Sequence, residues 1–66
     1  MKFYYFVSYH FSAGAYTLTS NCEVKRDSKI TSIKDVDETA RLIQEHEGYS
    51  GRPTILNFQL LRTTLS

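Results

Sequence analysis

The first eleven residues, MKFYYFVSYHF, constrain the fold of this 66-residue chain more than any other segment. Most of them are aromatic or β-branched, a composition that favours a pleated strand over a helix. Alternate residues of a strand point to opposite faces, and here both faces are apolar, with Tyr4 and Phe6 on one and Tyr5 and Val7 on the other. A chain of this size buries only about 60% of the surface that its unfolded form exposes. The segment therefore predicts a central strand whose two apolar faces both need burial, in a chain that has few other residues to bury them.

A hairpin and a second strand are expected next. Gly14, in the segment SAGA, tolerates a positive φ angle and suits a tight turn between antiparallel strands. Residues 16–24, YTLTSNCEV, alternate apolar and polar side chains, which is typical of a strand with one solvated face. The charged segment KRDSK then predicts a loop.

A helix is predicted for residues 33–47. Ser32 can cap its start, with Asp35 three residues later as an acidic variant of the capping box. Gly48 is a candidate left-handed cap at its end, and Pro53 prevents the helix from resuming. Apolar residues recur at spacings of three and four and form one stripe along the helix: Ile33, Val36, Ala40 and Ile43.

A third strand is expected at residues 54–61, TILNFQLL, again apolar on both faces. The hairpin makes the first two strands antiparallel neighbours, and a right-handed crossover through the helix brings the third strand beside the first. The sequence thus predicts a single α+β domain spanning residues 1–66 with the order β-β-α-β. Its three-stranded antiparallel sheet has the order 2-1-3, with the one helix packed on one face.

One helix can cover only one face of this sheet. The face predicted to lie beneath it contains Phe3, Tyr5, Val7, Tyr9, Leu18, Cys22, Val24, Leu56, Phe58 and Leu60. The other face is predicted to form a homodimer interface, made by Tyr4, Phe6, Ser8, His10, Ile55, Asn57, Gln59 and Leu61. Burying one Phe or Leu side chain is worth about 1.5 to 3 kcal/mol, so leaving several exposed would weaken a small domain. Two copies can associate sheet face on sheet face, or with their edge strands also joined.

Charge and cysteine content exclude several classes of protein. Eight Lys and Arg against seven Asp and Glu give a formal net charge of +1, so no overall field draws the chain to nucleic acid or to an anionic membrane. Cys22 is the only cysteine, which rules out an intrachain disulfide and fits a reducing cytoplasm. His10 and His46 show no metal-ligand spacing and no catalytic pattern with Cys22. We expect a cytoplasmic protein that is not an enzyme, with no cofactor, metal or membrane span.

An alternative function is binding of a nucleotide or of single-stranded nucleic acid. Tyr4, Phe6 and Tyr9 could stack on bases, and Lys25 or Arg52 could contact phosphate. RNA-recognition sheets of this kind have four strands, two helices and an aromatic-basic motif that FYYFVSYHF does not reproduce. Binding to protein is therefore the favoured interpretation.

Four residues of the helix and of the following loop are candidates for contact with a partner protein: Lys34, Arg41, Tyr49 and Arg52. Tyr and Arg are enriched among residues that dominate binding energy at interfaces. The competing interpretation is an ordinary solvated surface, since most charged helix faces and loops have no further role.

Three segments resemble a group of very short proteins from phages and mobile elements of Gram-positive bacteria: FVSYHF, then NCEVKRDSKITSIKDVDETARLIQE, then PTILNFQLL. Members begin with a tyrosine-rich strand, enter the helix through a D-S-K-I-T-S-like segment and finish on an I-L-N-F-like strand. The group is similar in size and style to phage anti-defence proteins, including an inhibitor of the bacterial Hachiman system. The resemblance implies a compact, non-enzymatic homodimer in the host cytoplasm that blocks a host defence protein by binding it. It assigns no functional residue, and the hairpin of this chain is longer than the pattern.

Overall fold

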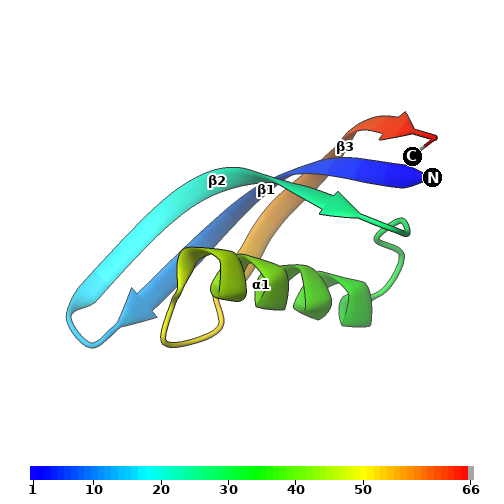
Figure 1. The fold of residues 1–66 in the computed structure, drawn as a ribbon. Helices are drawn as coiled ribbons and strands as arrows, with labels where there is room; N and C mark the ends of the chain where they lie inside the picture. Colours follow the sequence, from blue (N-terminus) through cyan, green and yellow to red (C-terminus); the bar gives the residue numbers. More distant parts are fainter. Residues whose placement is uncertain (66) are drawn as a thin grey trace.

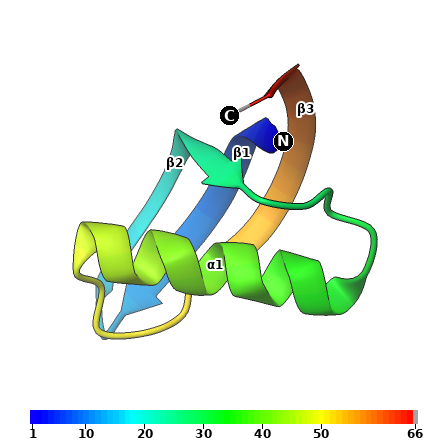
Figure 2. The same cartoon turned by 45° about the vertical axis from the view of Figure 1, so that its right-hand side comes forward.

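The computed structural model describes residues 1–65, which form three strands and one helix (Figure 1). In chain order they are β1 (Lys2–Ala13), β2 (Tyr16–Arg26), α1 (Ile33–Glu47) and β3 (Thr54–Thr64). All strand pairs are antiparallel and the sheet order is β2-β1-β3, with α1 lying across one side of it (Figure 2). The predicted α+β fold, its β-β-α-β order and its 2-1-3 sheet are confirmed. The third strand continues past its predicted end at Leu61.

Local sequence signals fix the turns. Ala13 pairs with Tyr16 across the hairpin, where Gly14 adopts a φ of 61°. The Ser32 hydroxyl accepts a hydrogen bond from the Asp35 amide at 3.3 Å and caps the start of α1. At the other end Gly48 takes the left-handed conformation, with a φ of 72°. The predicted limits of the helix are confirmed. They were predictable because each cap depends on residues close to the helix end in sequence.

The core lies between β1 and α1. Its centre is the helix-facing row of β1, where Tyr5, Val7 and Tyr9 are at most 4% exposed. From the helix, Ala40 and Ile43 complete it. These side chains include two tyrosines, whose hydroxyls need partners when buried, and Tyr5 accepts a hydrogen bond from the backbone amide of Ile30 at 2.9 Å.

A buried arginine joins the end of β2 to the first half of the helix. Arg26, only 4% exposed, lies opposite Phe3 on the helix side of the sheet. Its guanidinium donates to Glu38 at 3.0 Å, to Thr39 at 3.1 Å and to Asp35 at 3.4 Å. The charge is buried but is paired with carboxylates and hydrogen-bonded, which is the condition under which a protein interior tolerates an arginine.

Two β-bulges change the faces of β3. At each register shift one β3 residue, Leu56 or Leu61, has no counterpart on β1. As a result Ile55 lies opposite Tyr9 on the helix side and packs against the core. The prediction that Ile55 belongs to the open face is therefore wrong, because strict alternation cannot anticipate an extra residue. Leu56 was predicted for the core and is instead 57% exposed at the bulge.

Candidate interaction surface

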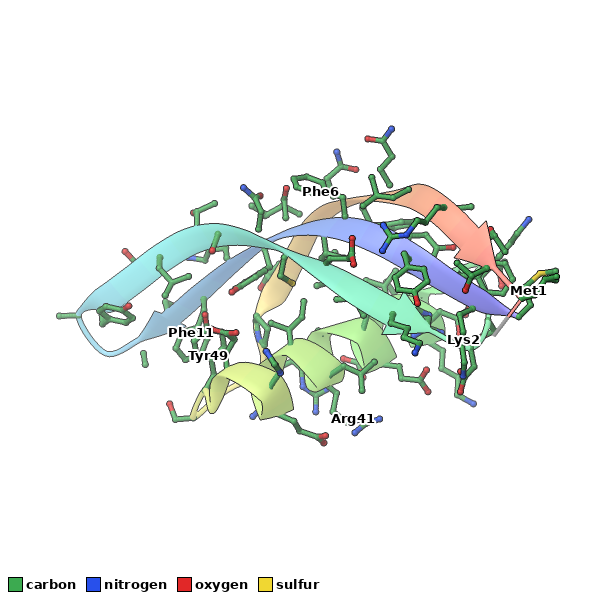
Figure 3. All side chains as sticks on the ribbon, turned by 45° about the horizontal axis from the view of Figure 1, so that its top comes forward. Met1, Lys2, Phe6, Phe11, Arg41 and Tyr49 are labelled. Carbon is green, nitrogen blue, oxygen red and sulfur yellow. The ribbon has the colours of Figure 1, made fainter. Side chains whose placement is uncertain are left out.

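The open face is the side of the sheet away from α1. Figure 3 shows Phe6 on this side, whereas Phe11 and Tyr49 lie between the sheet and the helix. Strand pairing places there six residues of the predicted interface: Tyr4, Phe6, Ser8, His10, Asn57 and Gln59. Beside them lie Arg62 of β3 and four polar residues of β2: Thr19, Asn21, Glu23 and Lys25. The structure therefore brings together the predicted residues other than Ile55, with Leu61 at the neighbouring bulge.

An ion pair crosses one end of the open face. Arg62 on β3 reaches over β1 and makes two hydrogen bonds to Glu23 on β2, at 3.1 and 3.2 Å. The bonds to this carboxylate raise the pKa of Arg62 above its ordinary value. The same guanidinium lies 4.1 Å from the centre of the Tyr4 ring, a cation–π contact. One side of the Tyr4 ring is thus occupied by a side chain of the same molecule.

Other polar groups of the open face are also paired with each other. Ser8 donates to the Asn21 side-chain oxygen at 2.8 Å, and the His10 Nδ1 and Thr19 hydroxyl are 3.4 Å apart. Phe6, which is 40% exposed, is the large apolar side chain left among them. The open face is therefore more polar than the sequence indicates, since Ile55 has left it and Arg62 covers part of Tyr4. Its role as a dimer interface stays a prediction.

The exposed apolar residues gather instead along β3. We call Leu56, Phe58, Leu60 and Leu61 the β3 surface; their exposed fractions run from 38% to 57%. Phe58 and Leu60 lie on the helix side, opposite Val7 and Tyr5, and were predicted to be core. The Phe58 ring does touch the core, edge-on to Tyr5 at 5.9 Å between ring centres. Both side chains nevertheless remain more than one-third exposed.

The helix contributes further exposed groups. Ile33, the first residue of α1, is 82% exposed although it begins the apolar stripe of the helix. Lys34 and Arg41, two of the predicted partner-binding residues, are exposed on α1. Arg41 forms an ion pair with Glu45 one turn later, at 2.6 Å. Pairs of this kind on an exposed helix surface are worth only about 0.3–0.5 kcal/mol, so Arg41 is available to a partner at small cost.

The other two predicted partner-binding residues hold the loop between α1 and β3 in place. Tyr49 stacks on Phe11, with ring centres 4.3 Å apart, and shares a hydrogen bond with the Tyr9 hydroxyl at 2.9 Å. That hydrogen bond is the main cause that raises the pKa of Tyr49 to about 12. Arg52 makes two hydrogen bonds of 3.1 Å to Asp37 on the helix. Sequence reasoning missed both tethers because each joins residues from separate elements.

A hollow of about 500 Å³ lies between β2 and the second half of α1. Its lining is apolar around Val24 and Leu42, and it also includes Cys22, His46 and Glu47. Burial and, to a lesser extent, the charge of Glu47 raise the pKa of the Cys22 thiol. A raised pKa keeps the thiol protonated, which is the opposite of the activation that a nucleophilic cysteine requires.

Among residues 1–65 no helix is long and apolar enough to cross a membrane. In the same range no group of three or more His, Cys, Asp or Glu side chains is arranged to hold a metal ion. Comparisons of the chain with protein-family models, with curated proteins and with solved structures find no match.

Proposed function

We propose that this chain is a non-enzymatic, homodimeric interaction protein that inhibits a bacterial antiviral defence by binding one of its components. The observation that carries the proposal is the β3 surface, a row of exposed apolar side chains on one edge strand. Contiguous exposed apolar surface of this kind marks interaction sites in most proteins.

The energetic argument concerns the size of the domain. Complete burial of one Leu or Phe side chain is worth about 1.5 to 3 kcal/mol, and each residue of the β3 surface retains a third or more of its exposure. Covering the whole surface is therefore worth several kcal/mol, against a total stability of about 5 to 15 kcal/mol for a typical domain. Association is a common way for a chain of this length to gain that stability.

The choice of a defence component as the target comes from the resemblance of the three segments to short phage proteins. In the proposed arrangement one apolar surface joins two copies in the cytoplasm of the host. The charged side of α1, with Lys34 and Arg41 exposed, is then left for the defence protein. Inhibition by binding needs no catalytic group, only a rigid surface. The two capped ends of α1 and its ion pairs with Arg26 and Arg52 favour that rigidity.

The proposal is tested in bacteria that carry a single defence system, Hachiman first, with and without the chain. Expression of the chain is expected to restore phage plating on the defended host, and tagged chain is expected to recover a defence protein from infected cells. Arg41→Glu, which reverses a charge on the helix, is expected to reduce inhibition while leaving folding and self-association intact. Failure to restore plating against any system of a representative panel would remove inhibition from the proposed function.

Nucleic-acid binding is tested with the same purified protein. A calorimetric titration with single-stranded DNA, single-stranded RNA and a cyclic nucleotide is expected to give no heat of binding, because Arg62 already covers one side of the Tyr4 ring. Saturable binding that weakens with added salt would instead favour the nucleotide or single-strand binding module.

A further inference from the structure

The apolar residues of the β3 surface lie on more than one side of the strand. Phe58 and Leu60 are on the helix side, whereas Leu61 occupies the bulge next to Arg62, which is on the open face. A partner laid flat on the open face would leave Phe58 and Leu60 exposed. A strand placed beside β3 would contact both sides of it at once. The distribution of these side chains therefore indicates a lateral neighbour.

We propose that this neighbour is β3 of a second copy of the chain, paired antiparallel around a two-fold axis to give one six-stranded sheet. The inference rests on the homodimer in the proposed function and specifies how its two copies meet. β3 is an edge strand, so one row of its backbone N–H and C=O groups faces away from β1. In proteins that stay monomeric, edge strands commonly carry charged side chains that prevent pairing with another chain. The single charged residue of β3, Arg62, is already paired with Glu23.

The alternation of side chains limits the position of the axis. An axis perpendicular to the sheet keeps both helices on one side, so each residue must meet a residue of the same face. Between the two bulges, axes through Asn57, Phe58 and Gln59 meet this condition, and the axis through Phe58 is the one that opposes two exposed apolar rings. It places the two Phe58 rings side by side and sets Asn57 of each copy opposite Gln59 of the other. Two apolar rings and two pairs of amide side chains then face each other, with no like charges opposed.

The helix adds to this contact. In Figure 2 the first turns of α1 (green) extend past the line of β3 (orange), toward the place that a neighbouring strand would occupy. Ile33 begins this part of the helix and is 82% exposed. In the paired sheet the start of each helix lies over the edge of the other copy, so Ile33 gains an apolar neighbour that the single chain does not provide.

The area of such an interface is sufficient only with the helix included. With the axis at Phe58, residues 54–62 of the two strands overlap, and these nine residues, at about 3.4 Å per residue and with about 10 Å of sheet thickness, bury roughly 310 Å² per copy and roughly 610 Å² in total. Stable interfaces bury about 1,000 Å² or more. The pairing therefore requires contact from the two helix starts as well, which is why both Ile33 and the β3 surface belong to the inference.

Disulfide trapping tests the pairing in a Cys22→Ser background. Phe58→Cys places two thiols at the axis, where paired residues have Cα atoms about 4.5–5.5 Å apart, within the range that a disulfide spans. We expect mild oxidation to cross-link most of this variant. Because Phe58 also touches Tyr5, a second test uses exposed polar positions. Asn57→Cys mixed with Gln59→Cys is expected to cross-link at least fivefold more than either variant alone.

Phe6→Cys in the same background is the matched control, since Phe6 has a similar exposed fraction but lies on the open face. It is expected to cross-link at least fivefold less than Phe58→Cys. Light scattering of the unmodified chain at micromolar concentration is expected to give twice the 7.6 kDa mass, and Ile33→Lys is expected to weaken self-association about tenfold, with an unchanged circular dichroism spectrum.

Two outcomes would overturn the inference, and they differ in what they leave standing. A dimer in which Phe6→Cys cross-links and the β3 variants do not would replace edge pairing by contact of the open faces, with the homodimer retained. A monomeric mass would remove both edge pairing and self-association. Phage plating is measured separately, so loss of inhibition by a chain that still cross-links through β3 would count against the proposed function alone.

Discussion

The two outer strands of the sheet, β2 and β3, have the same length and pair with the same central strand, yet their side chains have different surroundings. On β2 the helix-facing residues Val24 and Arg26 are buried, at 8% and 4% exposure, and the residues that alternate toward the open face, Thr19, Asn21, Glu23 and Lys25, are polar and exposed. On β3 none of the eleven residues is buried, although the strand is the more apolar of the two. Hydrophobicity alone therefore does not decide which strand is buried.

The reason is the size and direction of the helix. With its side chains a helix is about 10–12 Å wide, while three strands spaced about 4.8 Å apart, with their own side chains, need a wider cover. The Arg26 ion pairs hold the first half of α1 against the end of β2. Ile43 and the hollow lined by Val24 and Leu42 place its second half beside the same strand. The helix crosses the sheet without burying the apolar side chains along β3.

The largest difference in stability loss is expected between substitutions of the two arginines that form ion pairs on these strands. Arg26→Ala removes a buried guanidinium from Asp35, Glu38 and Thr39 and is expected to cost about 2 to 3 kcal/mol of the free energy of unfolding. Arg62→Ala removes an ion pair whose side chains are 52% and 47% exposed, and is expected to cost less than about 1 kcal/mol. Urea unfolding followed by circular dichroism measures both. Equal losses would contradict the difference between the strands.

Apolar truncations are expected to give the next largest contrast. Val24→Ala, in β2, deletes buried methyl groups and is expected to cost about 2 kcal/mol, from lost transfer energy plus a small cavity. Leu56→Ala, in β3, alters a side chain that is 57% exposed and is expected to cost less than about 1 kcal/mol in dilute protein. Unfolding at two protein concentrations sharpens the comparison. A loss at Leu56 that grows with concentration would locate part of its burial between copies.

A smaller effect is expected at the loop that leads into β3. Folding raises the pKa of Tyr49 from 10.0 to about 12, chiefly through the hydrogen bond with Tyr9. Below pH 10 the phenol is protonated in both states, and its contribution to stability is fully present. Between pH 10 and 12 the unfolded chain loses the proton first, so stability is expected to fall as pH rises. Unfolding measured across this range tests the sign, and Tyr49→Phe is expected to flatten the slope. An unchanged slope would mean that other groups cause it.

The smallest effect concerns thiol reactivity on the two strands. Burial raises the pKa of Cys22 on β2, so its thiol is expected to react with iodoacetamide at pH 8 several-fold more slowly than an exposed cysteine. Leu56→Cys in the Cys22→Ser background supplies that exposed thiol on β3. Similar rates at both positions would show that β2 is no better covered than β3.

Much of the fold was predictable because its signals are local. Ser32 and Gly48 mark the helix ends, Gly14 marks the hairpin, and the order of elements leaves one simple sheet topology. The candidate surface was less predictable. The loop residue Tyr49 looked free in sequence but packs on Phe11, and Phe58 looked buried but is more than one-third exposed. The exposure of both residues depends on contacts between elements that are distant in sequence, and hydrophobic periodicity does not predict such contacts.

The sequence by itself therefore determined the set of elements and their order. It also determined that the sheet has more apolar side chains than one helix can bury. Only the tertiary structure decided where that surplus lies. Two bulges in β3 moved Ile55 to the helix side, and the ion pairs of Arg26 joined the first half of the helix to the end of β2. A bulge adds one residue to a strand and so exchanges its faces, and a helix axis can cross a sheet at many angles. Both are set by the packing of the whole chain, so the exposed apolar surface came to lie along one edge.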